Sequence, residues 1–435
     1  MMMDVALQAL KYTEKYTDLA EIFVEKEQVL QLDIQNDKLD FAKEESTSGV
    51  GIRVILDGKM GFSYTSNPEE IKNTVERAIS NSKANEKDEN FTLSQPTKYK
   101  DIKGTYDEGI NSLEVETALE FAQTMINTVK DAKCQPTSGG FSAVLSKMLI
   151  LNSNGVSCQD KSTGFAGYLA VNAEKGDEKS TAYDSESSCF LNIDPEKLAS
   201  KVCKLATDSI GGKPVETKDM DIIVDHHAGA GLLGTFINAL NADNVLRGRS
   251  ILADKVGEEV VSSNLSIYDN GTLEHGLNSS RCDGEGTASE KTSLIENGVL
   301  KGFIFDLYNA SKAGAKSTGN GIRPSFAETP TISVTNVMVD YGTKTDLSEL
   351  DDVILVTDVL GAHTANPISG DFSVEANNAF VVKNGEISHP VKKAMLSGNI
   401  FEALKKSEAM DSEIKQYGPF VMPQILLHDL RVVGQ

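Results

Sequence analysis

Two neighbouring histidines, His226 and His227, stand near the middle of the chain, between an apolar run at residues 222–224 and a longer apolar stretch. The run predicts a β-strand that includes the histidines, and neighbouring side chains of a strand point to opposite faces. The two imidazoles therefore cannot bind one metal ion without a bend, and we expect one to be buried and one exposed. A zinc site that combines one of them with His275 and Cys282 has suitable ligand types but no diagnostic spacing, so we favour a structural role.

A pair of carboxylates, Asp283 and Glu285, lies in the loop sequence RCDGEGTASE. Two carboxyl groups can divide the roles of general acid and general base between them. In a glycine-rich loop such residues more often form turns and salt bridges. We therefore expect a structural role, with peptide binding as the functional alternative.

A second glycine-rich loop, STGNGIR, spans residues 317–323. Its backbone N–H groups and its guanidinium group suit a carboxylate or another anion. The loop is a candidate for holding a peptide, although a plain turn is the simpler expectation. The residues concerned are Gly319, Asn320, Gly321 and Arg323.

The apolar stretch after the histidines predicts a buried helix, because its large side chains share one broad face. These side chains are Leu232, Leu233, Phe236, Ile237 and Leu240. Residues 228–242 contain no His, Cys, Asp or Glu, so this helix offers none of the strong transition-metal ligands. The chain also lacks GxSxG, HExxH and the P-loop pattern GxxxxGKS or GxxxxGKT, which excludes the usual parts of serine hydrolases, zincins and P-loop NTPases.

Local patterns place further elements around these candidates. Asp57 and Gly58, flanked by apolar residues, are typical of a type I′ hairpin turn. Asn111 and Glu114 form a capping-box pair that predicts the start of an amphipathic helix. Residues 137–192 consist of short β-prone pieces separated by turns, which predicts antiparallel strands.

These patterns predict an α+β protein of two domains. Residues 1–215 combine helices with a mixed or antiparallel sheet, with a possible sub-boundary near residues 85–110, where the chain is polar and rich in turn formers. Residues 216–435 form a mostly β domain with one central buried helix. A chain of 435 residues is too long for one core, because single cores stop growing near ~250 to 300 residues.

The chain is acidic, with 64 Asp and Glu against 42 Lys and Arg and a formal net charge of −22. This charge repels the phosphate backbone, so we expect no nucleic-acid binding. Five cysteines without a CxxC pair fit a reducing compartment. The N-terminus is unlike a signal peptide, and the longest uncharged apolar run is shorter than the ~20 residues of a spanning helix. We expect a cytoplasmic protein without membrane association.

Five segments form an ordered set: SILADKVGEEVVSS, RCDGEGTASEKTSLIENGVLKGFIFDLYNA, KSTGNGIR, ISGDFSVEANNAFVVKNGEISHPVKKAMLSGN and VMPQILLHDLRVVG. Together they resemble the TldD/PmbA family, once called modulators of DNA gyrase. The resemblance implies a two-domain α+β fold and a metal-dependent peptidase that acts on unfolded or linear peptides. It also implies a catalytic TldD-type subunit that pairs with a PmbA-type (TldE-type) subunit.

The resemblance places the HExxxH motif of the catalytic type on the central helix. Aligned on the leucine pair that precedes it, the motif falls on Gly234, Thr235 and Ala239, and no cysteine follows Cys282 to match the C-terminal cysteine of the catalytic type. The resemblance therefore implies a PmbA-type subunit with no catalytic residues and no metal or cofactor of its own. A metal ion, with zinc the expected one, belongs to the TldD-type partner.

Three functions follow from these observations. The leading one is a non-catalytic subunit of a cytoplasmic two-subunit peptidase, whose partners are a TldD-type chain, a second copy of itself, and unfolded peptides. The alternative is a homo-oligomeric peptide-binding module without peptidase activity. The third is an enzyme that uses Asp283, Glu285 and a histidine in an unrecognised way. The old gyrase name implies no DNA contact for this acidic chain.

Overall fold

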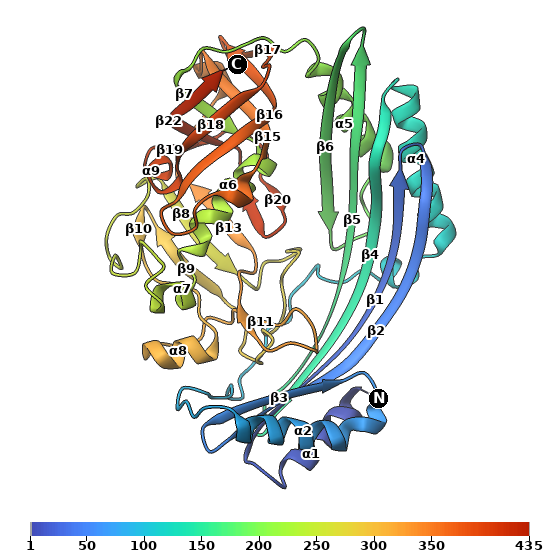
Figure 1. Cartoon of the computed structure of the whole chain (residues 1–435), viewed down its shortest axis with the longest axis vertical. Coiled ribbons are helices and arrows are strands. Elements are labelled where there is room, and N and C mark those ends of the chain that lie inside the picture. The colour runs from blue at the N-terminus through green and yellow to red at the C-terminus, as the bar shows by residue number, and fades with distance from the viewer. Residues whose placement is uncertain (1, 435) are drawn as a thin grey trace.

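Four long antiparallel strands dominate the N-terminal half of the computed structural model, which describes residues 2–434. Shorter strands flank them, and the order across the sheet is β3-β2-β1-β4-β5-β6. Figure 1 shows this sheet as a long curved layer beside the C-terminal half. The strands are β1 (Leu19–Gln35), β2 (Lys38–Leu56), β3 (Lys59–Thr65), β4 (Gln135–Asn152), β5 (Ser157–Lys175) and β6 (Glu178–Ser188).

The predicted hairpin lies between β2 and β3. Asp57 and Gly58 both have positive φ, 54° and 75°, as the type I′ turn requires. The strands on either side pair antiparallel, with Leu56 opposite Lys59. The Asp57-Gly58 turn therefore fixes the register of β2 against β3.

Two pairs of helices cover the sheet at its two ends (Figure 1). At one end α1 (Met2–Thr13) and α2 (Ile71–Ala84) pack on apolar residues that include Ile22 and Ile52. At the other end α4 (Val115–Asp131) and α5 (Pro195–Asp208) pack on a second cluster with Leu32, Phe141 and Leu169. Two one-turn elements, η1 (Pro68–Glu70) and α3 (Glu108–Asn111), precede α2 and α4.

The capping box predicted for Asn111 and Glu114 is wrong. Asn111 is the last residue of α3, and its side chain donates a hydrogen bond of 2.7 Å to Glu108. Glu114 itself precedes α4 and makes no side-chain cap hydrogen bond. Helix α4 therefore begins without a side-chain cap from Glu114.

The C-terminal half contains a closed ring of five strands, because the last strand pairs with the first. The ring consists of β7 (Lys218–Val224), β15 (Val353–Leu360), β16 (Asp371–Lys383), β18 (Ala394–Asn399) and β22 (Ile425–Gly434). Three shorter strands extend the sheet beyond the ring: β14 (Lys344–Thr345), β17 (Glu386–Pro390) and β19 (Ser407–Met410).

A second sheet lies beside this barrel, with the order β10-β9-β8-β13-β21-β20. Its strands are β8 (Leu265–Asn270), β9 (Lys291–Glu296), β10 (Val299–Leu300), β13 (Val337–Tyr341), β20 (Lys415–Tyr417) and β21 (Phe420–Met422). A small pair, β11 (Gly321–Ile322) and β12 (Thr331–Ile332), stands apart. The α+β prediction, with an antiparallel N-terminal sheet and a mostly β C-terminal half, is confirmed.

Short helices complete the C-terminal half around one longer helix. That helix, α6 (His226–Asn238), belongs to the largest apolar cluster of the chain. The others are α7 (Ala242–Leu246), α8 (Leu307–Ala313), α9 (Ile400–Lys405), η2 (Leu347–Glu349) and η3 (Ala362–Thr364). Within residues 2–434, no helix combines the length and the apolar character that crossing a membrane demands.

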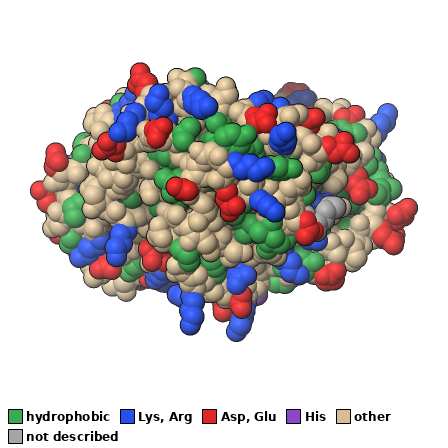
Figure 2. Space-filling view, turned by 90° about the horizontal axis from the view of Figure 1, so that it is seen from below, with side chains coloured by type: hydrophobic (Ala, Val, Ile, Leu, Met, Phe, Trp, Pro, Cys, Tyr) green, Lys and Arg blue, Asp and Glu red, His purple; other side chains and the backbone are tan. Residues whose placement is uncertain are grey.

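The surface carries charges of both signs. On the face seen in Figure 2, Lys and Arg alternate with Asp and Glu, and the described side chains there form no continuous basic stripe. Mixed charges of this kind favour solubility over the binding of a polyanion.

Candidate functional site

Helix α6 lies at the centre of the C-terminal half and follows strand β7 directly. The carboxylate of Asp225 accepts a hydrogen bond of 2.8 Å from the backbone N–H of His226 and so caps the helix. Leu232, Leu233 and Phe236 are at most 2% exposed. The predicted buried helix is confirmed, and its burial explains why its sequence is almost entirely apolar.

One stripe of α6 is not buried in the core. Its residues, His227, Gly231, Gly234 and Asn238, recur at the helical period. A Cβ atom at Gly234 would meet nothing within 4 Å, so this position opens onto free space. This stripe is the part of the helix that a ligand can reach.

The two histidines lie in the first turn of α6, and their assignment to a strand is wrong because Asp225 starts the helix before them. His226 is 8% exposed, and both its ring nitrogens have partners: Nδ1 lies 2.6 Å from Asp225 and Nε2 lies 2.9 Å from the Glu413 carbonyl. His227 is half-buried at the surface of the helix. His226 is therefore buried as expected, whereas His227 is half-buried instead of exposed, and both lie on a helix.

His227 lines a cleft of about 950 Å³ between strand β6 and helix α6. Its ring packs against two tyrosines in tilted arrangements, with centroid distances of 4.5 Å to Tyr417 and 5.7 Å to Tyr183. Its Nδ1 lies 3.4 Å from Asp358, whose other carboxylate oxygen accepts a hydrogen bond of 3.2 Å from Asn377. A carboxylate beside one imidazole nitrogen restrains the orientation of the ring.

Asp225 caps α6 with a charged side chain. Burial alone would raise the pKa of this carboxyl, but hydrogen bonds from His226 and Gln424 outweigh burial and lower it to about 2. The side-chain amide of Gln424 donates one of these bonds at 3.0 Å. Asp225 is therefore ionised at neutral pH and favours the N-terminus of the helix.

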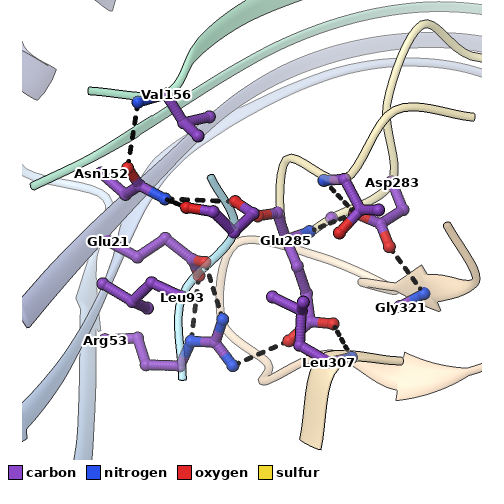
Figure 3. A network of polar contacts seen from close by, with 12 residues as sticks. Glu21, Arg53, Leu93, Asn152, Val156, Asp283, Glu285, Leu307 and Gly321 are labelled. Carbon is purple, nitrogen blue, oxygen red and sulfur yellow. Dashed lines mark hydrogen bonds and ion pairs between the residues drawn. The ribbon is translucent and has the colours of Figure 1, made fainter. Parts of the chain in front are cut away.

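Asp283 and Glu285 lie in a buried polar network between the two halves of the chain (Figure 3). One oxygen of Asp283 accepts hydrogen bonds of 2.9 Å from the backbone N–H groups of Glu285 and Thr287. The other accepts a bond of 2.9 Å from Gly321. Both oxygens of Asp283 are thus used within the chain, where they hold the RCDGEG loop against the STGNGIR loop.

Glu285 connects this loop to the long sheet. Its Oε1 accepts a hydrogen bond of 3.0 Å from Arg53, and its Oε2 accepts one of 2.8 Å from the backbone of Leu307. Burial raises the pKa of Glu285, and the charge of Arg53 opposes that rise. The Glu285 carboxylate thus bonds to Arg53 of the long sheet and to Leu307 of the C-terminal half.

Arg323 completes the network. Its Nη2 pairs with Glu21, and its Nε donates a hydrogen bond of 2.6 Å to the carbonyl of Gly284. Glu21 also receives Arg53 at 2.7 Å and 3.0 Å. Burial lowers the pKa of Arg323 to about 10, although the neighbouring Glu21 works against this change. Arg323 as a whole is 8% exposed, and the donors of its guanidinium point to partners inside the chain.

The STGNGIR loop is shaped by its glycines and its asparagine. Gly319 has a φ of 75°, and a Cβ at Gly321 would overlap the Glu285 carboxylate. Asn320 is fully buried, and its amide donates hydrogen bonds of 2.8 Å to Asp269 and 2.9 Å to the Ser333 carbonyl. The loop therefore packs as one unit against the buried carboxylates.

The zinc ligands considered from the sequence have separate surroundings. The ring of His275 packs against Phe190, with centroids 5.5 Å apart. Cys282 lies in a small apolar cluster with Cys158. Among the residues that the structure describes, no three His, Cys, Asp or Glu side chains are grouped so as to hold a metal ion.

Comparison with known proteins covers nearly the whole chain. Residues 20–82 match PmbA/TldA metallopeptidase domain 1, residues 108–210 match the central domain, and residues 217–434 match the C-terminal domain. An uncharacterized protein of Methanocaldococcus jannaschii is 35% identical over 423 residues, which is 96% of this chain and 97% of that protein. The chain belongs to the PmbA/TldD metallopeptidase family.

Named members and solved structures of the PmbA/TldD family agree with this assignment. The metalloprotease PmbA of Escherichia coli O157:H7 is 24% identical over 443 residues, 98% of this chain and 95% of that protein. The crystal structure of TldE from Thermococcus kodakarensis superposes with a TM-score of 0.92 at 25% identity, covering 99% of this chain and all of that one. A putative modulator of DNA gyrase from Thermotoga maritima gives the same TM-score at 26% identity, with full coverage of both chains.

The three positions that the sequence resemblance led us to expect at the HExxxH motif differ in their surroundings. Gly234 lies on the open stripe of α6, whereas Thr235 and Ala239 are 8% and 1% exposed. Ala239 is also the C-cap residue of the helix. The side chains at these positions, a hydrogen, a hydroxyl and a methyl, include no strong metal ligand.

Sequence reasoning missed several residues around these sites. Glu21 and Arg53 sit opposite each other in strands β1 and β2, and each interrupts an otherwise apolar segment. That interruption was the available signal for a buried ion pair. Tyr183, Tyr417 and Asp358 gave no such signal, because only the tertiary fold brings them to His227.

Proposed function

We propose that this chain is the non-catalytic, PmbA-type subunit of a cytoplasmic two-subunit metallopeptidase that acts on unfolded or linear peptides. The observation that carries the proposal is helix α6: its accessible stripe and the positions aligned with HExxxH hold no His, Cys, Asp or Glu beyond His227. Membership of the family supports a role in a peptidase, and the residues of this helix support the view that the metal site lies in the other subunit.

The chemistry of a metallopeptidase explains why this difference matters. A bound zinc ion lowers the pKa of its water toward ~7 and polarises the scissile carbonyl. Gly234, Thr235 and Ala239 cannot hold an ion for these tasks. We therefore place the metal in a TldD-type partner and expect no peptidase activity from this chain alone.

A non-catalytic subunit can still form a wall of the peptide cleft. Strand β6 is the last strand of its sheet, and the cleft separates it from α6. The carbonyl of Thr181 already accepts a hydrogen bond of 3.0 Å from Asn378 across this edge. Because backbone groups repeat their direction every two residues along a strand, the N–H and C=O of Tyr183 face the same side. An extended peptide would pair there through its main chain.

The test uses the full chain, purified without metal, and a TldD-type relative. An unstructured fluorogenic peptide is incubated with each protein alone and with both together. The proposal expects cleavage by the mixture, its loss with EDTA, and no cleavage by this chain alone. EDTA-sensitive hydrolysis by the lone chain would falsify it, and so would full activity of the relative without this chain.

The same experiment separates the alternative, a homo-oligomeric peptide-binding module. In that case the chain self-associates in light scattering, does not copurify with a TldD-type chain, and binds a labelled peptide without turnover. Copurification as a mixed dimer rules the module out.

A further inference from the structure

Two cysteines from different halves of the chain meet at the boundary between those halves. Cys158 lies near the start of β5 in the long sheet, and Cys282 lies in the RCDGEG loop. Both belong to one small apolar cluster with Phe23, Ile150 and Phe326, and both are at most 2% exposed. They are the two cysteines of this cluster, so their side chains share one small patch of the core.

The residues beside the cysteines hold the two segments against each other. The backbone N–H of Arg281 donates a hydrogen bond of 2.7 Å to Asp160, and its guanidinium donates one of 3.1 Å to the carbonyl of Gln159. Gln159, the residue after Cys158, is therefore hydrogen-bonded to Arg281, the residue before Cys282. A disulfide requires two such segments in close approach, with Cβ atoms about 3.5 to 4.5 Å apart.

We propose that Cys158 and Cys282 are a disulfide-forming pair, which joins the long sheet covalently to the C-terminal half when a low-molecular-mass disulfide is present. The two thiols are oxidised together: they lose two protons and two electrons, and one S–S bond forms between them. One molecule of oxidised glutathione is reduced to two molecules of glutathione. The first exchange leaves a mixed disulfide, and the second protein thiol then displaces glutathione.

Cys282 is buried, at 1% exposure, and is the member of the pair that lies beside a cavity. This residue borders a cavity of about 450 Å³ between the long sheet and the C-terminal half. Contact with the Cys158 thiol and burial both raise the pKa of Cys282, so little thiolate forms at neutral pH. The reaction is therefore slow at neutral pH and speeds up as the pH rises and more thiolate forms.

The other cysteines provide matched controls. Cys134 and Cys203 also lie together, but both belong to the N-terminal half, and the Cys134 sulfur lies 3.9 Å from the Cys203 carbonyl. Cys189 stands apart, with its sulfur 3.7 Å from the carbonyl of Gly276. A disulfide at either place would not join the two halves through Cys282.

The experiment oxidises the full native chain with glutathione disulfide, blocks the remaining thiols, and maps the peptides by mass spectrometry. The expected result is one intramolecular disulfide per chain that links Cys158 to Cys282, with a Tm several degrees above that of the reduced chain because the bond closes a long loop. Cys158→Ala and Cys282→Ala should each remove the bond and the Tm difference, while Cys134→Ala keeps both.

Other outcomes overturn the proposal. They are a fully reduced native chain after prolonged oxidation at about pH 9, a Cys134–Cys203 bond alone, or a stable mixed disulfide of Cys282 with glutathione. Mapping the wild-type chain is sufficient for this decision, so it does not depend on the folding of the variants.

Discussion

Arg53 in strand β2 donates a hydrogen bond of 3.0 Å to Glu285 of the C-terminal half, although the two residues are 232 positions apart in the chain. Both side chains are at most 8% exposed. The same guanidinium also holds Glu21 in strand β1. The contact between the two halves is thus anchored by charges that lie out of reach of solvent, and those charges depend on one another.

Removing Arg53 should leave the buried Glu285 carboxylate without its cation and Glu21 with Arg323 alone. We expect Arg53→Met to lower the free energy of unfolding by about 3–5 kcal/mol, the range for breaking a buried ion pair. Lys87→Met is the control, because Lys87 pairs with Glu89 at the surface and such a pair is worth about 0–1 kcal/mol. Urea unfolding of both variants measures the difference, and equal losses would contradict this role of Arg53.

The charge of Asp225 should make stability depend on pH in the acid range. Its pKa is lowered to about 2 in the folded chain, whereas the usual value is about 3.9. Ionisation therefore favours the folded state above about pH 4, and this contribution is lost as the pH falls toward about 2. Asp225→Asn keeps an oxygen to cap α6 but removes the charge. The Tm difference between wild type and variant should shrink on acidification; a constant difference would argue against the charge.

Two glycines of α6 should respond in opposite ways to the same substitution. A Cβ at Gly234 meets nothing within 4 Å, so Gly234→Ala should stabilise the chain by about 0.5–1 kcal/mol through the lower backbone entropy of the unfolded state. A Cβ at Gly229 would overlap the methyl of Met422, which is fully buried. Gly229→Ala should therefore destabilise by about 1–3 kcal/mol. Thermal unfolding checks both, and a loss at Gly234 would show that the stripe is not open.

The chain should not bind duplex DNA at physiological salt. Its formal net charge of −22 opposes the phosphate backbone, and the charges on the face in Figure 2 are mixed. A mobility-shift assay at micromolar protein measures this directly. A shift that weakens with added salt would identify a basic surface elsewhere and refute the expectation.

Features that depend on neighbours in sequence were predictable. Asp57 and Gly58 specify their turn with backbone angles of their own, and the apolar residues of α6 specify burial through their spacing. The place of His226 and His227 was not predictable from the apolar run before them, because the decisive signal was the cap at Asp225. A strand and a helix start can share the same few residues.

The functional surroundings were less accessible to sequence reasoning. Asp283 and Glu285 were expected from the sequence to form turns or salt bridges, but the cation that pairs with Glu285, Arg53, comes from a strand of the N-terminal half. The packing of Tyr183 and Tyr417 against His227 likewise joins three distant segments. Such pairings follow from topology, which local periodicity does not encode.

The pairing of β22 (Ile425–Gly434) with β7 (Lys218–Val224) also constrains how the chain is made. During translation β7 and α6 leave the ribosome about two hundred residues before their last neighbour, so the ring of strands stays open for most of that time. The apolar face of α6 is fully covered only after the residues near the C-terminus have been synthesised. A nascent chain at this stage should be a substrate for chaperones, and loss of the final strand should be far more damaging than its length implies.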